Sequence, residues 1–146
     1  MSEILTPELI SAAGTATTRE EAIQEAGDLL VKAGAVTVDY VDAMFEREKT
    51  VSTYMGNFLA IPHGTNDAKE TILRSALSFV RYANPIDWNG KGQDVRCVVG
   101  IAGVGNEHLG ILSKIAVIFS DMDEAQKLID STTVEELYGE LKDLND

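Results

Sequence analysis

The chain has little cysteine, few basic residues and no long apolar run. Its single cysteine, Cys97, excludes an internal disulfide and any CxxC metal or redox motif. Twelve Lys and Arg stand against 24 Asp and Glu, giving a net charge of −12, and such an acidic surface repels nucleic acid and anionic lipid. No stretch approaches the ~20 apolar residues that span a bilayer, and the N-terminus lacks the pattern of a signal peptide. We therefore expect a soluble intracellular protein with no nucleic-acid partner and no membrane insertion.

The 146 residues, 45% hydrophobic and 25% charged, have the composition of one globular domain over residues 1–146. Thr18 and Glu21 have the spacing of a capping box, which begins a helix. Apolar residues recur every three to four positions over 22–33, and Gly34 is a typical helix stop. A second helix is expected from Thr37, and further helix starts at Asp121 and Thr133.

Short apolar runs at 58–61, 75–82 and 95–102 predict strands, the last one central and covered on both faces. Asn89-Gly90 predicts a turn and 51–56 a loop. The segment 109–119 is apolar on most sides, which predicts a well-buried helix. Helices alternate with short strands, so the fold class is α/β, a mixed and mostly parallel sheet flanked by helices on both faces.

The two histidines have similar settings at the ends of elements. His63 lies between Pro62 and Gly64, and His108 opens a helix after strand 95–102 and a glycine-rich turn. Sites in α/β proteins form where loops leave strand ends. If the two strands are neighbours, both imidazoles are expected to meet at one rim of the sheet.

Several chemistries are excluded by absent motifs. The chain has no P-loop, no G-x-S-x-G nucleophile elbow and no H-E-x-x-H zinc motif. Residues 100–105 (GIAGVG) are spaced differently from a dinucleotide-binding fingerprint and are interpreted as a turn. Cys97, in mid-strand with no activating charges nearby, is expected to be an inert core thiol. What remains is a histidine nucleophile, because a neutral imidazole can attack phosphorus near pH 7.

Phosphoryl transfer requires compensation of the charge on the equatorial oxygens. Arg47 is a candidate donor, although its place in the charged run 46–49 by itself favours a solvated residue. The other candidates are a histidine, a hydroxyl and the backbone N–H groups after His63, namely His108, Thr53, Gly64 and Thr65.

Glu48, six further residues and then 55–64 (MGNFLAIPHG) resemble the phosphorylation-site signature of type 2 enzyme IIA domains of the bacterial sugar phosphotransferase system. The resemblance extends over nearly the whole chain. Segments 40–65 (YVDAMFEREKTVSTYMGNFLAIPHGT) and 98–109 (VVGIAGVGNEHL) are most similar to the mannitol branch. One departure is Phe58, where a small residue is common, and phenylalanine tolerates a positive φ poorly.

The resemblance implies that His63 is phosphorylated through Nε2. The phosphoryl group would come from the histidine-containing phosphocarrier protein HPr and pass to a cysteine of enzyme IIB, with the membrane enzyme IIC involved only indirectly. The carrier would be cytoplasmic. His108 and Arg47 match family residues that stabilise the phosphoryl group, whereas Thr53, Gly64 and Thr65 are supporting candidates from their residue chemistry alone. No metal, nucleotide or other cofactor is implied.

Two alternatives remain at the level of the sequence. In the nitrogen-regulatory branch of the family, phosphorylation of His63 would switch binding to other proteins, although the segment Asn106-Glu107-His108 favours the mannitol branch. The other alternative is a structural or zinc-binding domain in which the two histidines and carboxylates hold a metal without transfer chemistry.

Overall fold

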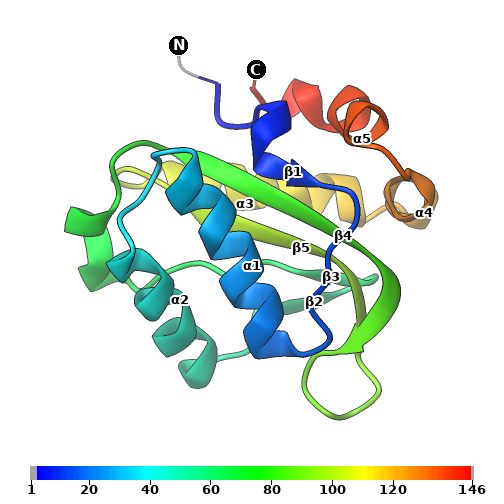
Figure 1. The fold of residues 1–146 in the computed structure, drawn as a ribbon, viewed down its shortest axis with the longest axis horizontal. Coiled ribbons are helices and arrows are strands. Elements are labelled where there is room, and N and C mark those ends of the chain that lie inside the picture. The colour runs from blue at the N-terminus through cyan, green and yellow to red at the C-terminus, as the bar shows by residue number, and fades with distance from the viewer. Residues whose placement is uncertain (1–2, 146) are drawn as a thin grey trace.

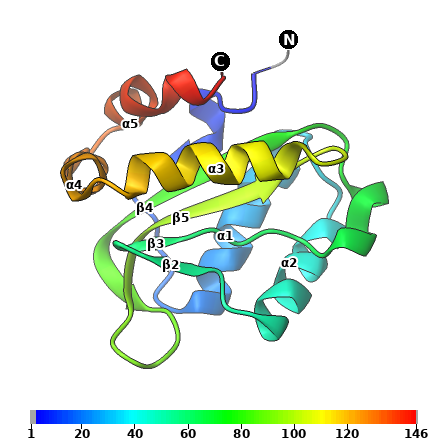
Figure 2. The same ribbon diagram turned by 180° about the vertical axis from the view of Figure 1, so that it is seen from behind.

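The computed structural model describes residues 3–145. Five strands form one sheet in the order β1-β4-β5-β3-β2: β1 (Ile10–Ser11), β2 (Tyr54–Gly56), β3 (Leu59–Ala60), β4 (Ala76–Asp87) and β5 (Asp94–Ala102). The helices are α1 (Arg19–Lys32), α2 (Asp39–Thr50), α3 (Glu107–Phe119), α4 (Met122–Asp130) and α5 (Val134–Leu141). Helices α1 and α2 cover one face, and α3 covers the other (Figures 1 and 2). The expected mixed α/β fold is confirmed, with two parallel and two antiparallel pairings between the strands.

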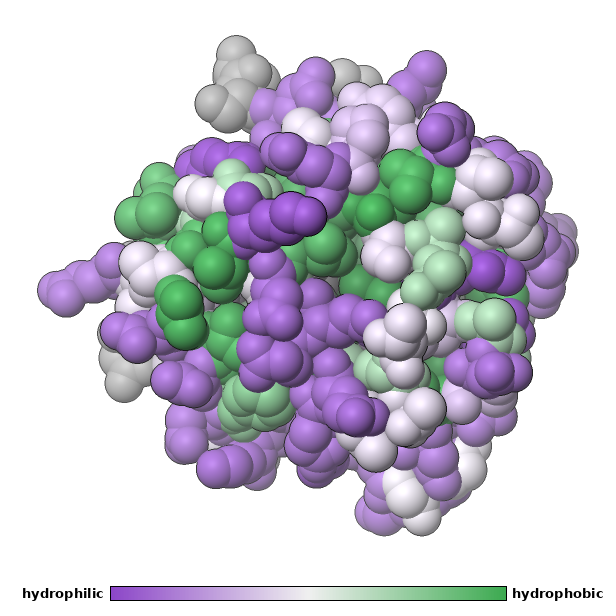
Figure 3. Space-filling view, viewed as in Figure 1, coloured by the Kyte–Doolittle hydropathy of each residue, from purple (hydrophilic) through white to green (hydrophobic). Residues whose placement is uncertain are grey.

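Helix α1 begins and ends where the sequence predicts. The Thr18 hydroxyl accepts a hydrogen bond from the Glu21 N–H, and the Glu21 carboxylate accepts one from the Thr17 N–H. Gly34 takes a φ of 76°, which ends the helix. The inner side of α1 packs on the sheet, and its outer side is hydrophilic (Figure 3).

Strands β4 and β5 form the centre of the sheet as an antiparallel hairpin. The turn at Asn89-Gly90 is confirmed, with Gly90 at a φ of 71°. Strand β4 runs further than the predicted 75–82, through Pro85, because its pairing shifts register between Arg81 and Ile86 and a proline is tolerated at such an irregularity. Cys97 on β5 is fully buried, and burial raises the pKa of its thiol to about 12, as expected for an inert core residue.

The predicted loop at 51–56 is wrong for its second half. Tyr54–Gly56 forms β2, which pairs antiparallel with β3. The connecting residues Asn57 and Phe58 take φ values of 50° and 68°, so the unusual phenylalanine does occupy a left-handed conformation. The Asn57 side chain donates to the Phe119 carbonyl at 2.7 Å, which ties this turn to the end of α3.

The predicted burial of α3 is also wrong. Only one side of the helix, with Ile111, Ile115 and Phe119, packs against the core. Leu109 and Val117 are 56% and 71% exposed. An apolar composition all round cannot show which side of a helix meets the sheet, and here one apolar side faces solvent.

Helices α4 and α5 begin at the predicted caps, Asp121 and Thr133. Helix α5 packs against the edge strand β1, and α4 packs against α3, β4 and β5. The two ends of the described chain lie together, because the Asn145 side chain bonds both the N–H and the carbonyl of Leu5. No helix within residues 3–145 is long and apolar enough to cross a membrane.

Candidate functional site

The two histidines meet at one end of the sheet, as the sequence predicts. Strand β3 runs parallel to β5, and the chain stays beside β5 after Pro62, whose carbonyl accepts a hydrogen bond from the Ile101 N–H at 3.1 Å. His63 therefore lies opposite Ile101. Two residues after Ile101, at Gly103, strand β5 has ended and the chain turns toward α3. His108 lies in the first turn of that helix.

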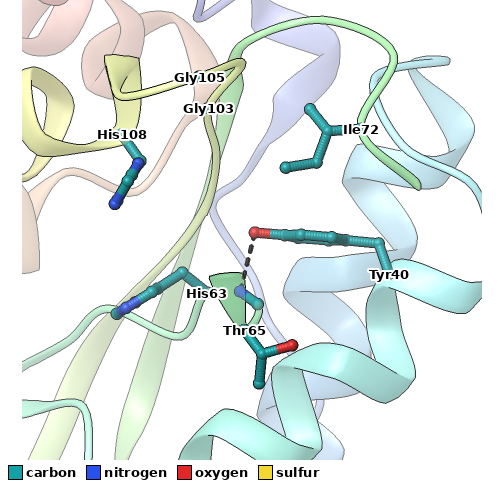
Figure 4. Close-up of a pocket in the computed structure, with 8 residues that line it drawn as sticks. Tyr40, His63, Thr65, Ile72, Gly103, Gly105 and His108 are labelled. Carbon is teal, nitrogen blue, oxygen red and sulfur yellow. Dashed lines mark hydrogen bonds between the residues drawn. The ribbon is translucent and has the colours of Figure 1, made fainter. Parts of the chain in front are cut away.

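His63 and His108 line one pocket, together with Tyr40, Gly64, Thr65, Ile72, Gly103 and Gly105. Figure 4 shows the two imidazole rings on the same side of the 103–105 turn, with Tyr40 and Ile72 on the opposite side. Of the residues expected to support the site, Gly64 and Thr65 line this pocket.

The hydrogen bond of His63 defines which ring nitrogen is available. Nδ1 lies 2.8 Å from the Ile61 carbonyl oxygen, and a carbonyl can only accept, so Nδ1 carries the proton and Nε2 keeps its lone pair. The ring is half-buried. Burial lowers the pKa of His63 below its usual 6.5; Arg47 and His108 act in the same direction, and the Ile61 bond and Glu48 oppose them. A neutral imidazole with a free Nε2 is the form that can act as a nucleophile.

Arg47 contributes positive charge near His63 from the last turn of α2. Its Nη1 donates to the Val51 carbonyl at 2.7 Å, beyond the end of the helix. Its charge is close enough to lower the pKa of His63. Arg47 is thus more than a solvated charge on an outer helix surface, and its guanidinium has further N–H groups to offer an anion.

Tyr40 holds the backbone that follows His63. Its hydroxyl accepts a hydrogen bond from the Gly64 N–H at 2.8 Å and donates one to the Ile101 carbonyl at 2.5 Å. A Cβ at Gly64 would collide with the Tyr40 ring, so only glycine permits this close approach. Burial raises the pKa of Tyr40 to about 12, which keeps the hydroxyl protonated and able to donate. Tyr40 thus fixes the His63 loop to the end of β5.

Thr53 lies behind the loop and is only 4% exposed. Its hydroxyl donates to Glu48 at 3.0 Å, its N–H donates to the same carboxylate at 2.6 Å, and its carbonyl accepts from the Ile61 N–H at 3.0 Å. Thr53 therefore connects Glu48 on α2 to Ile61, which lies two residues before His63.

The start of α3 is held by a serine and a glycine. The Ser75 hydroxyl accepts from the Val104 N–H at 2.9 Å and donates to the Glu107 carboxylate in a short hydrogen bond. A Cβ at Gly103 would collide with the backbone of His108. These contacts set the position of the first turn of α3, and with it the place of the second imidazole.

Sequence reasoning assigned no role to Tyr40, and it placed Glu48 in the solvated run 46–49, which is wrong because Glu48 is only 7% exposed. The signal was present in α2, whose buried residues are Tyr40, Val41, Met44 and Glu48. Positions 40, 41, 44 and 48 share one face of a helix, so a carboxylate and a tyrosine hydroxyl were predictable on the side that meets the core. Among the side chains that the structure describes, no group of three or more His, Cys, Asp or Glu is placed to hold a metal ion.

A family model described as "Phosphoenolpyruvate-dependent sugar phosphotransferase system, EIIA 2" matches residues 3–144. The mannitol-specific phosphotransferase enzyme IIA component of Halalkalibacterium halodurans is 48% identical over 143 residues, which cover 98% of this chain and 97% of that protein. Among solved structures, the complex of enzyme IIAMTL and phosphorylated enzyme IIBMTL from Escherichia coli matches with a TM-score of 0.88 and 36% identity, covering 94% of this chain and 96% of that one. Nitrogen regulatory protein IIA-Ntr from Neisseria meningitidis matches with a TM-score of 0.81 and 28% identity over 94% and 96%.

Proposed function

Since the chain belongs to the type 2 enzyme IIA family of the phosphoenolpyruvate-dependent sugar phosphotransferase system, we propose that it carries a phosphoryl group on Nε2 of His63. The donor is HPr, and the acceptor is the cysteine of a mannitol-type enzyme IIB, with the membrane enzyme IIC as an indirect partner only. Residues 1–146 act as one enzyme IIA domain, in the cytoplasm with its donor. The observation that carries the proposal is the Nδ1–Ile61 hydrogen bond, which leaves Nε2 free in a pocket shared with His108.

In the first step, Nε2 of neutral His63 attacks the phosphorus of the phosphohistidine on HPr. The Nε2–P bond forms as the P–N bond of the donor breaks, and the electron pair of that bond returns to the donor imidazole. The proton of His63 stays on Nδ1, where the Ile61 carbonyl stabilises the positive charge that the ring gains. Burial of the ring supports this step because it keeps His63 neutral before the attack.

His108 and Arg47 compensate the charge on the three equatorial oxygens during transfer. His108 is suited to this role by its place in the same pocket, and Arg47 by the effect of its charge on His63. Gly64 and Thr65 support the phosphoryl group by lining the pocket that holds it. Thr53 supports it indirectly, because its carbonyl accepts a hydrogen bond from Ile61 in the loop that carries His63.

In the second step, the thiolate of enzyme IIB attacks the phosphorus on His63. The S–P bond forms as the P–Nε2 bond breaks, and Nε2 regains its lone pair.

The mannitol specificity is supported by the name of the relative from H. halodurans and by the E. coli complex with phosphorylated enzyme IIB.

The test is a reconstituted transfer with labelled phosphoenolpyruvate, enzyme I and HPr, comparing the wild-type chain with His63→Ala. We expect label on the wild-type chain and none on the variant, and label that passes to a mannitol-type enzyme IIB domain. Label on His63→Ala would refute the assignment of the carrier residue. A labelled wild-type chain that transfers to no enzyme IIB domain would instead favour the nitrogen-regulatory alternative.

A further inference from the structure

A buried carboxylate lies behind the phosphorylation loop and is not used by the proposed chemistry. Glu48 is only 7% exposed. It accepts three hydrogen bonds: from the Thr53 N–H at 2.6 Å, from the Thr53 hydroxyl at 3.0 Å and from the Trp88 indole N–H at 2.6 Å. Burying a carboxylate is costly unless donors surround it, so this arrangement joins α2, the segment before β2 and the β4–β5 hairpin into one unit.

The unit reaches His63 through the backbone. The Thr53 carbonyl accepts from the Ile61 N–H at 3.0 Å, and the Ile61 carbonyl accepts from His63 Nδ1 at 2.8 Å. Pro62 lies between Ile61 and His63, and its ring restricts the backbone there. Fixing Thr53 therefore fixes Ile61, and the Ile61 carbonyl in turn selects the tautomer and the orientation of the imidazole.

We propose that Glu48 is the positioning residue of the phosphorylation loop, acting on His63 through Thr53 and Ile61 without touching the phosphoryl group. The inference rests on the proposed function, since it explains how the carrier imidazole is held ready. Glu48 also follows Arg47 directly on α2, so the same turn of helix carries the cation whose charge lowers the pKa of His63 and the carboxylate that holds Thr53. Its negative charge opposes the lowering of the pKa of His63.

The test is Glu48→Gln, which keeps the shape of the side chain. An amide has one acceptor and one donor end, so in either orientation its NH₂ faces the N–H of Thr53 or of Trp88. We expect kcat for phosphoryl acceptance to fall by about tenfold to a hundredfold, as for a misplaced reacting group, with KM for HPr within about twofold. Imidazole ¹⁵N NMR of the unphosphorylated protein should show His63 leaving its single Nδ1–H tautomer and its pKa falling further.

Glu46→Gln is the matched control, because it removes the same charge from an exposed position on the same helix. It should leave kcat and the His63 tautomer as in the wild type. If Glu48→Gln is folded and shows a wild-type kcat and tautomer, the proposal is wrong. The NMR readout needs no phosphoryl transfer, so it separates failure of this inference from failure of the carrier assignment.

A second pair of variants decides the matter if Glu48→Gln does not fold. Thr53→Val removes one donor to Glu48 and keeps both backbone bonds of Thr53, whereas Thr53→Ser keeps the hydroxyl. We expect a shift of the His63 tautomer signal in Thr53→Val and its recovery in Thr53→Ser. Identical His63 spectra in the two variants would overturn the proposal.

Discussion

At the scale of single residues, the ability of His63 to act as a nucleophile depends on two effects, a hydrogen bond at Nδ1 and the burial of the ring. The Ile61 carbonyl holds the proton on Nδ1, and burial disfavours the charged ring. Together they leave Nε2 unprotonated at neutral pH. In the proposed carrier role, the same carbonyl would also stabilise the ring once it holds the phosphoryl group, so one hydrogen bond would serve both states.

We predict from the lowered pKa that less than half of His63 is protonated at pH 6.5, where an ordinary histidine is half protonated. An NMR titration of the His63 ring should give a midpoint below 6.5 in the folded protein and near 6.5 in concentrated urea. Because the unfolded chain binds this proton more readily, stability should fall as the pH drops from 6.5 toward the folded midpoint. A folded midpoint at or above 6.5 would contradict the prediction.

The sequence predicted which residue types gather at the site but not how each one points. His63 and His108 were placed at strand and helix ends by their flanking proline and glycines, and the structure brings them into one pocket. The direction of the Thr53 hydroxyl was not predictable, because it depends on Glu48, a residue on another element. Hydrogen bonds between distant segments leave no local pattern.

At the scale of elements, the junction between β5 and α3 places the second imidazole. Gly103 directly follows β5 and lies against the backbone of His108. Ser75, directly before β4, forms hydrogen bonds with Val104 and Glu107 and so connects the 104–107 turn to the start of β4. The first turn of α3 is therefore positioned by the sheet itself. This tight turn therefore places His108 at the pocket that it lines.

We predict that Gly103→Ala slows phosphoryl transfer and destabilises the protein, because the new Cβ meets the backbone of His108, which cannot yield without shifting α3. Overpacking of this kind costs about 1–3 kcal/mol, measurable by urea unfolding. Gly110→Ala is the control: its Cβ would meet nothing within 4 Å, and alanine in a helix is favoured over glycine by up to about 1 kcal/mol. Equal stability of the two variants would show that the junction is not tight.

Local sequence signals predicted helix starts, helix ends and turns correctly where a capping residue or a glycine sets the backbone conformation. Thr18, Asp121 and Thr133 cap their helices, and Gly34 and Gly90 take positive φ values as expected. Strand β2 was missed because Tyr54–Gly56 is short and is paired only by the fold. The exposed side of α3 was missed because its exposed residues, such as Val117, are as apolar as its buried ones.

At the scale of the whole molecule, the net charge of −12 is spread over a small surface. Hydrophilic side chains cover the outer side of α1 (Figure 3), where Glu20, Glu21 and Asp28 are exposed. The solvent-facing side of α3 differs, since Leu109, Gly110, Ser113, Ala116 and Val117 carry no charge. The field of the molecule is thus broadly negative, while the helix that bears His108 presents little charge of its own apart from Lys114 and Glu107.

We predict that this negative field speeds the encounter with a phosphoryl donor that presents a basic face. Such steering acts on association and is screened by salt, because the Debye length falls from about 10 Å at 0.1 M ionic strength to about 3 Å at 1 M. The value of kcat/KM for acceptance from the proposed donor, HPr, should therefore fall severalfold between low and high salt. The value of kcat should change little, since salt screening acts on the encounter of the separated proteins and much less on transfer between docked partners. The measurement is a steady-state titration of the donor at several salt concentrations, with kcat serving as the internal control. A kcat/KM that is flat or rises with salt would mean that the acidic surface has no part in docking, and that apolar contact alone brings the two carriers together.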